Sequence, residues 1–148
     1  MIELEMKNKE QVLKLIDEIS NVLSLLIELK KNGQFREALE NIDNTLLRYF
    51  NCNTDFIYSV SEDFFIDALK EEKGLSTEEL SSLAELLIEQ GDILFRQNNL
   101  KDSSKVLRST LKIYFFLNDD QDFFSFKNMN KMVIINDKLA KINLKIEN

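Results

Sequence analysis

Residues 29–38 of the chain read LKKNGQFREA, and residues 94–103 read LFRQNNLKDS. In both stretches a helical segment ends in a polar turn, and the next segment opens with an aromatic residue or Leu, then a base, an acid and a small residue. The match continues at two further pairs of positions, Ile42 with Leu107 and Thr45 with Thr110. Such self-similarity is typical of helical repeats, so the two stretches predict two related helical hairpins.

The segment before Gly33 shows the helical period most clearly. Its apolar residues recur at intervals of three and four positions, at Val12, Leu15, Ile19, Val22, Leu26 and Leu29. This pattern predicts a helix over residues 10–31, and further apolar residues widen its apolar face: Leu13, Ile16, Leu23, Leu25 and Ile27. Gly33 is expected to end this helix in the left-handed conformation.

The rest of the chain also predicts helices, over residues 35–50, 55–60, 62–72, 76–97, 101–117 and 121–142. We expect capping boxes at Ser59 with Glu62 and at Ser76 with Glu79, and a cap for the last helix from residues 118–120. The chain has no proline, only three glycines, and no run that alternates with period two. The sequence therefore predicts a single all-α domain over residues 1–148 with about six to seven helices.

Small residues stand at matching positions in the two copies. Gly91 precedes the second turn, Ser103 and Thr110 follow it, and Ala38 and Thr45 are the equivalents in the first copy. At these positions the chain resembles the tetratricopeptide repeat (TPR), in which small residues let the two helices of a hairpin approach. This resemblance implies a short TPR-like α-solenoid of antiparallel hairpins with a C-terminal capping helix. A generic helical bundle is the alternative.

The first copy departs from that family's pattern, because Leu26 occupies the place of a small residue. The departure implies looser packing or a different crossing angle in the first hairpin. Residues 51–76 are expected to form a degenerate repeat of short helices between the two copies. Over its whole length the chain also resembles an uncharacterised family of small all-helical bacterial proteins, and that resemblance implies no activity.

The net charge of −7 argues against nucleic acid as a partner, because a protein that holds nucleic acid normally presents a basic face. Ten acidic residues against Lys70 and Lys73 give the segment from Glu62 to Asp92 a net charge of −8. No apolar run is long enough to span a membrane, and Cys52 stands alone. We expect an acidic protein of the bacterial cytoplasm; the preference for Lys over Arg, with many Asn and Ile, suggests an AT-rich genome.

The chain carries no pattern of residues typical of catalysis. It lacks histidine, so the commonest general base and transition-metal ligand are absent, and Glu-x-x-His pairs for a diiron site cannot occur. Cys52 has no histidine to activate it, and the three glycines are too far apart to form a phosphate loop. The sequence therefore predicts a protein that is not an enzyme, with no cofactor and no metal.

The TPR resemblance instead implies a partner-binding groove. Its lining would come from the first helix of each hairpin, at Leu23, Ile27, Lys30 and Lys31 in the first copy and at Ile88, Asp92, Phe95, Arg96 and Asn99 in the second. A groove with apolar residues and a few bases suits an amphipathic helix or an extended peptide, with Lys30, Lys31 and Arg96 steering an acidic segment. In the alternative interpretation, Leu23, Ile27 and Phe95 are ordinary core residues.

The first predicted helix has more apolar positions than one narrow stripe requires. A second copy of the chain could cover the remainder, which would make the protein a structural homodimer. Burial against the last helix of the same chain is the alternative. A regulator that binds a small molecule near Phe95 is a third hypothesis.

Overall fold

The computed structural model describes residues 2–120 and 122–147, with side chains from residue 9 onward, and these residues form seven α-helices. The helices are α1 (Ile2–Lys31), α2 (Phe35–Phe50), α3 (Thr54–Ser59), α4 (Phe65–Asp67), α5 (Thr77–Arg96), α6 (Leu100–Asp119) and α7 (Phe126–Glu147). A 3₁₀ turn (Glu62–Phe64) precedes α4, and a π-helical turn (Ala68–Glu72) follows it. No strand occurs among the described residues, and the prediction of an all-α fold is confirmed.

Tight turns between the helices use residues with positive φ. Gly33 (φ +71°) ends α1 as predicted, and Gly74 (φ +68°) lies before α5. Asn51 (φ 54°) and Asn98 (φ 61°) take the same conformation after α2 and α5. Glycine and asparagine are the residues that tolerate this left-handed region best, so the polar turns of both copies end their helices as the sequence predicts.

Of the two predicted capping boxes, the structure contains one. Ser76 Oγ accepts a hydrogen bond from the Glu79 backbone N–H, and Glu79 Oε1 accepts one from the Ser76 backbone N–H. The box at Ser59 was predicted wrongly, because Ser59 Oγ donates to the Phe56 carbonyl within α3 and the next turn starts only after Ser61.

The start of the last helix was also predicted wrongly. Helix α6 extends to Asp119, beyond its predicted end at residue 117, and α7 begins at Phe126 instead of residue 121. Ser125 Oγ accepts a hydrogen bond from the backbone N–H of Asn128, which is the side-chain cap that a helix starting at Phe126 needs.

Helices α5 and α6 pack closely at the small residues that the sequence marks. A Cβ on Gly91 would lie 2.5 Å from Leu107 Cδ2, so only glycine allows this approach. Ser103 Oγ donates a 2.7 Å hydrogen bond to the Gly91 carbonyl across the same contact. Ser103 and Thr110 are both fully buried on the facing side of α6. The small residues of the second copy therefore allow the α5–α6 packing that was expected of them.

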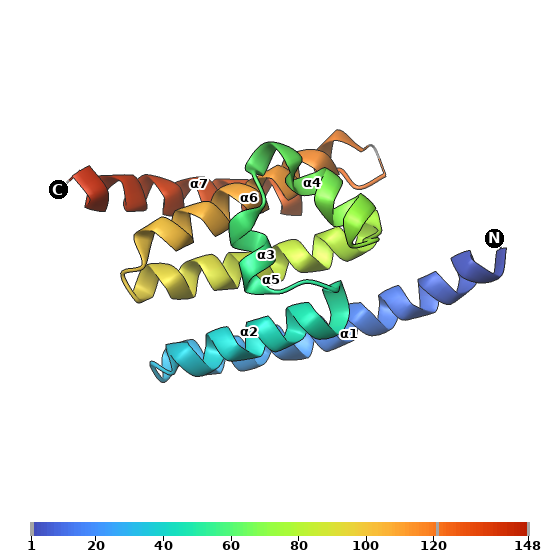
Figure 1. Cartoon of the computed structure of the whole chain (residues 1–148), viewed down its shortest axis with the longest axis horizontal. Coiled ribbons are helices and arrows are strands. Elements are labelled where there is room, and N and C mark those ends of the chain that lie inside the picture. The colour runs from blue at the N-terminus through green and yellow to red at the C-terminus, as the bar shows by residue number, and fades with distance from the viewer. Residues whose placement is uncertain (1, 121, 148) are drawn as a thin grey trace.

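The two hairpins stack directly on each other, with α5 in contact with both α1 and α2. In Figure 1, α5 lies between the α1–α2 pair and the α6–α7 pair. Residues 51–76 are therefore not a repeat interposed between the two copies, contrary to expectation. Instead α3 and α4 lie across α6, where Arg108 Nε donates to Glu62 Oε1 (2.7 Å) and Lys105 donates to the Val60 carbonyl.

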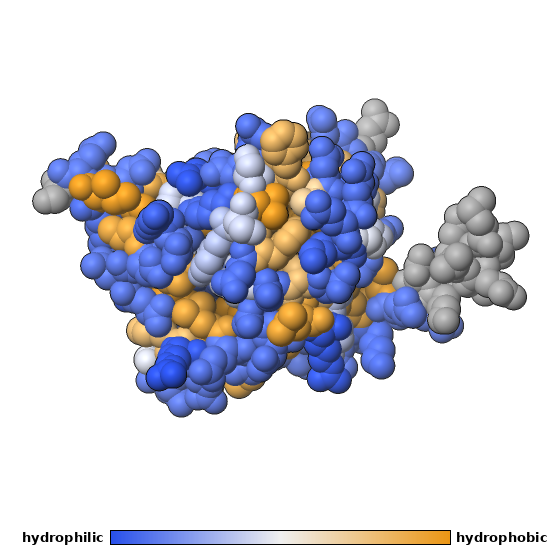
Figure 2. All heavy atoms as spheres, in the orientation of Figure 1, coloured by the Kyte–Doolittle hydropathy of each residue, from blue (hydrophilic) through white to orange (hydrophobic). Residues whose placement is uncertain are grey.

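Helix α7 packs mainly on α6, with a smaller contact to α5. Of the described α7 side chains, Ile135 and Ile142 are buried, while Phe126 and Met129 are exposed. Figure 2 shows a mostly hydrophilic face with separate apolar patches, one of them near the C-terminal end of α7, where Leu144 and Ile146 are each 61% exposed. Of the two alternatives for the excess apolar surface of α1, burial by the last helix holds at most locally: Phe123 shares a cavity with Ile16 and Ile19, while Leu13 and Ile27 stay exposed.

Candidate binding groove

A buried carboxylate joins three helices on one side of the molecule. Asp92 on α5 is only 6% exposed. Its Oδ2 atom accepts hydrogen bonds from Lys30 Nζ of α1 (2.9 Å) and Arg96 Nε of α5 (3.0 Å), and its Oδ1 atom accepts one from Lys138 Nζ of α7 (2.8 Å). Lys30 also pairs with Glu89. We call Asp92, Lys30, Arg96 and Lys138 the Asp92 cluster.

The cluster determines the charge state of its carboxylate. Burial alone would raise the pKa of Asp92, but the hydrogen bonds from Lys138, Lys30 and Arg96 outweigh burial and hold that pKa well below its usual range. Burial likewise disfavours the charged form of Lys30, yet its hydrogen bonds to Glu89 and Asp92 raise its pKa. Asp92 is thus ionised at neutral pH and fastens α1 and α7 to α5.

Beyond the Asp92 cluster, α1 and α5 pack side by side toward the start of α7. We call the strip of surface between the exposed side of α1 and the polar side of α5, which ends in a cavity, the groove. Its α1 side carries a second apolar stripe, distinct from the one that enters the core. Positions 13, 16, 20, 23 and 27 recur at intervals of three and four, and all but Ser20 are apolar. Leu13 is 59% and Ile27 is 57% exposed, whereas Leu23 is half-buried against the core. The chain's own fold leaves much of this stripe in contact with solvent.

At its far end the groove opens into a cavity of about 340 Å³. The cavity is lined by residues of α1, the N-terminal half of α5 and the segment that leads into α7: Ile16, Ile19, Ser20, Glu78, Ser81, Ser82, Glu85, Phe123 and Lys127. Glu78, Ser82, Glu85, Glu89 and Asp92 follow one another on α5 at intervals of four, three, four and three, so they form one polar stripe along the helix. The groove therefore has an apolar α1 side and a polar, acidic α5 floor.

The structure brings together three of the nine residues that the sequence predicts for a groove. Lys30, Asp92 and Arg96 meet in the Asp92 cluster. Ile27 and Lys31 are exposed on α1. Lys30 and Arg96 are both paired with Asp92, and the role of these two bases in steering an acidic partner stays a prediction.

The other four predicted residues have structural roles. Ile88 is buried in the core, and Leu23 and Phe95 are half-buried against it. The Lys145 ammonium lies 4.6 Å from the centre of the Phe95 ring. Asn99 does not line the groove, because its Oδ1 atom caps α6 by accepting a hydrogen bond from the Asp102 backbone N–H. The interpretation of Leu23 and Phe95 as core residues is thus closer to the structure, whereas it fails for Ile27.

Sequence reasoning missed the most informative groove residues. Lys138 lies 46 positions from Asp92, so no local pattern connects the two. The polar stripe of α5 could have been found, because its carboxylates and Ser82 recur at helical spacing. From the sequence, these carboxylates were considered only as part of the segment from Glu62 to Asp92 with its net charge of −8.

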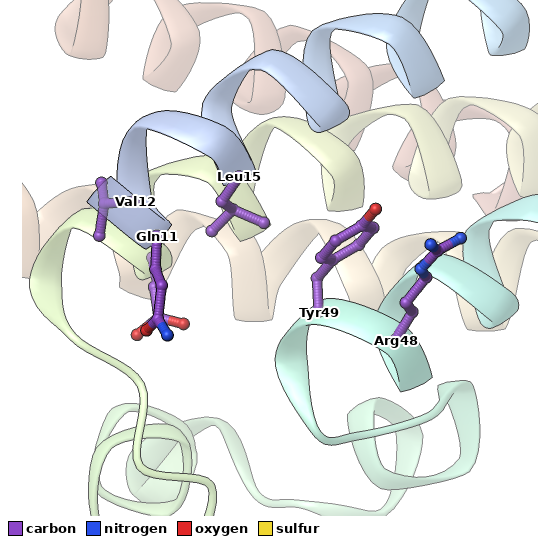
Figure 3. A pocket seen from close by; sticks show the side chains of 6 residues that line it. Gln11, Val12, Leu15, Arg48 and Tyr49 are labelled. Atoms are coloured by element: carbon purple, nitrogen blue, oxygen red, sulfur yellow. The ribbon is translucent and has the colours of Figure 1, made fainter. Parts of the chain in front are cut away.

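Two further cavities lie outside the groove. One of about 190 Å³ lies between α1, α2 and the start of α5; Figure 3 shows Leu15 of α1 on the side of Tyr49 of α2, with Val12 and Gln11 farther along α1 and Arg48 beyond Tyr49. The other, about 530 Å³ in volume, is an open depression on α2 beside Gln97. Phe95 lines neither these cavities nor the groove cavity, so the structure offers no support for a small-molecule site there.

Cys52 is the chain's single thiol and is buried at the end of α2. Burial raises its pKa to about 11, so the thiolate is scarce at neutral pH. Within the described residues no group of three His, Cys, Asp or Glu side chains is placed to hold a metal ion.

No helix in the described part of the chain combines the length and the apolar character that crossing a membrane requires. The sequence matches no protein-family model, and no curated protein or solved structure matches it. The TPR resemblance accordingly stays a prediction.

Proposed function

We propose that the protein is a non-enzymatic interaction module whose groove between α1 and α5 binds an amphipathic helix or extended peptide of a protein partner. One observation carries the proposal: the second apolar stripe of α1 stays exposed beside the cavity between α1 and α5. Large exposed aliphatic side chains in register along a helix are typical of a helix-binding surface.

The exposed stripe supplies part of the free energy of binding, and polar contacts beside it must supply the rest. Complete burial of one Ile or Leu side chain contributes about 1.5–3 kcal/mol. Leu13, Ile16 and Ile27 retain about half of their surface for a partner. Because most of the surrounding surface is polar, the stripe would determine where along α1 a partner helix lies.

The experiment is a tagged pull-down that compares the wild-type chain with Ile16→Glu/Ile27→Glu. A stoichiometric partner is expected with the wild type and should be lost with this variant, because two charges would interrupt the stripe. The matched control is Leu144→Glu/Ile146→Glu, which adds the same charges at equally exposed apolar positions near the end of α7. Retention of the partner by the stripe variant, with its helical content unchanged, would contradict the proposal.

An Arg96→Glu variant is unsuitable for this purpose. It would place a second carboxylate beside Asp92, so any loss of binding could arise from a damaged Asp92 cluster. Lys31→Glu is the better test for steering by a base, since Lys31 is exposed.

A second candidate, a homodimer through α1, is favoured by the same stripe. In Figure 1 the N-terminal part of α1 extends past the other helices, which leaves room for a second copy. Light scattering at tens of micromolar separates the two candidates. A mass of 17.4 kDa would support the partner-binding function, and twice that mass would support the dimer.

A further inference from the structure

We propose that the groove cavity binds a Lys or Arg side chain of the partner, so that the partner segment is a basic amphipathic helix. This inference rests on the proposed function and specifies the chemistry of its partner. It reverses the charge that the sequence alone predicts, because Lys30 and Arg96 are paired with Asp92 while Glu78 and Glu85 line the cavity.

The carboxylates flank the cavity at helical spacing. Glu78 lies four residues before Ser82 and Glu85 lies three residues after it, so both acids are one turn away from Ser82 on the same face of α5. Glu78 is exposed and makes no ion pair within the part of the chain that the structure describes. A cation above Ser82 would therefore lie within reach of two negative charges.

Ser82 provides an independent indication of a ligand. Its side chain lines the cavity, the residue is only 8% exposed, and its hydroxyl has no hydrogen-bond partner among the described residues. The oxygen itself is open to the cavity, so a group that enters the cavity can reach it. A serine hydroxyl accepts hydrogen bonds, and a lysine ammonium or arginine guanidinium only donates them.

The opposite side of the cavity suits the aliphatic part of such a side chain. Ile16 and Ile19 of α1 and Phe123 supply apolar surface facing the acids. Lys and Arg bury their methylene stems along apolar surface while the charged end finds polar groups. A cavity with one apolar side and one acidic side therefore matches a long basic side chain better than an acidic or a purely apolar one.

Lys127 partly fills this role in the unbound protein. Its Nζ atom is 3.7 Å from Glu85 Oε1, and the Lys127 side chain is largely exposed. A loose, solvated pair of this kind contributes little stability, so a partner's cation can displace it. The bases at the closed end, Lys30 and Lys138, are held at 2.9 and 2.8 Å from Asp92 and are not displaced in this way.

The groove also limits the length of the partner segment. Asp92 lies 14 residues after Glu78 on α5, and at a rise of 1.5 Å per residue this distance is about 21 Å. A helix of about four turns would fill it. Its apolar face would lie on the α1 stripe, and one basic residue would lie at the end beside Glu78 and Glu85.

The test uses two fluorescein-labelled designed peptides of about 18 residues. Both have the same Leu/Ala apolar face and a Gln-rich polar face, and they differ only at one terminal position, which is Lys in one and Glu in the other. Fluorescence anisotropy should show at least about tenfold tighter binding of the Lys peptide to the wild type, as expected for charge-assisted hydrogen bonds in a partly buried site. Equal binding of the two peptides, or no binding of the Lys peptide, would overturn the inference.

Two variants locate the preference in the cavity. Glu78→Gln/Glu85→Gln should remove the preference for the Lys peptide, whereas Glu71→Gln/Glu72→Gln, with the same charge change on the segment across α6, should retain it. Lys127→Gln should tighten binding of the Lys peptide, because it removes the internal competitor. Weaker binding of that peptide by Lys127→Gln would contradict the inference.

The inference and the proposed function can fail separately. If Ile16→Glu/Ile27→Glu releases the cellular partner while the two peptides bind equally, the groove is a binding site without a cation anchor. If the stripe variant retains the partner, the proposed function itself fails.

Discussion

Gly91 and Asp92 are neighbours in the chain, and each determines how α5 meets a different part of the molecule. Gly91 allows the close approach of Leu107 on α6, and Asp92 binds Lys30 of α1 and Lys138 of α7. The TPR resemblance identified the role of Gly91, because that family has a small residue at this position. Sequence reasoning missed the role of Asp92, because the identity of a buried carboxylate's partners depends on residues far away in the chain.

Gly91→Ala is expected to destabilise the protein by about 1–3 kcal/mol, the usual cost of overpacking a core. Alanine has a better helix propensity by about 1 kcal/mol, but its Cβ would lie 2.6 Å from the Leu107 Cγ, so the fully buried Leu107 side chain would have to shift within the core. Urea unfolding measures the loss. In a double-mutant cycle, Leu107→Ala should relieve part of the cost, and strict additivity of the two changes would contradict the contact.

Asp92→Asn is expected to cost about 2–4 kcal/mol at neutral pH, because it leaves Lys30 and Lys138 without their shared anion. The exposed Asp137→Asn serves as the control and should change stability by about 0.5 kcal/mol or less. Both values come from the free energy of unfolding in urea.

The same variant should alter the response to acid. Since the pKa of Asp92 is lowered in the folded state, its stabilisation is complete above the unfolded-state pKa of about 3.9 and is lost as pH falls toward the folded-state value. The unfolding free energy of the wild type should therefore fall more steeply than that of Asp92→Asn below about pH 5. Parallel pH profiles would show that Asp92 is not the group responsible.

At the scale of single helices, the sequence located α2 and α5 well because their ends depend on neighbouring residues. Gly33 and the Ser76–Glu79 box act within one turn. The start of α7 was misplaced because apolar residues after Asp120 continue a helical pattern, while the cap that decides it is Ser125. The excess apolar surface of α1 was recognised, but whether α7 covers it could be learned only from the packing.

The docking of α7 provides a test at this scale. Ile135→Ala should cost about 2–4 kcal/mol, because Ile135 is fully buried and its loss leaves a cavity. Its neighbour Ile134 is 43% exposed, so Ile134→Ala should change stability by about 0.5 kcal/mol or less. Equal costs in urea unfolding would mean that α7 does not pack in this register.

At the scale of the whole molecule, residues 51–76 separate the two hairpins in the sequence, but the hairpins pack directly against each other in the structure. The repeated stretches predicted both hairpins, but not that α5 would pack directly on α1 and α2. The position of residues 51–76 depends on contacts such as Arg108 with Glu62, 46 positions apart. A helical sequence pattern relates residues three or four positions apart, so it cannot predict a contact between residues this distant.

Because α5 of the second hairpin also packs against α1 and α2 of the first, we expect the described parts of the chain to unfold in one transition. Cys52 lies between α2 and α3 and is 4% exposed, so alkylation of its thiol reports on the middle segment. The urea midpoint for Cys52 alkylation should coincide with the midpoint from far-UV circular dichroism. Alkylation at lower urea would show that residues 51–76 open independently of the hairpins.

The Asp92 cluster also has a consequence for the order of events during synthesis. Lys30 and Asp92 leave the ribosome before Lys138, which follows Asp92 by 46 residues. At 5–20 residues per second, roughly 2–9 s pass between the emergence of Asp92 and that of Lys138. In the last part of this interval, between the emergence of Asp119 and that of Lys138, α6 lacks its α7 cover, so its apolar surface is available to chaperones.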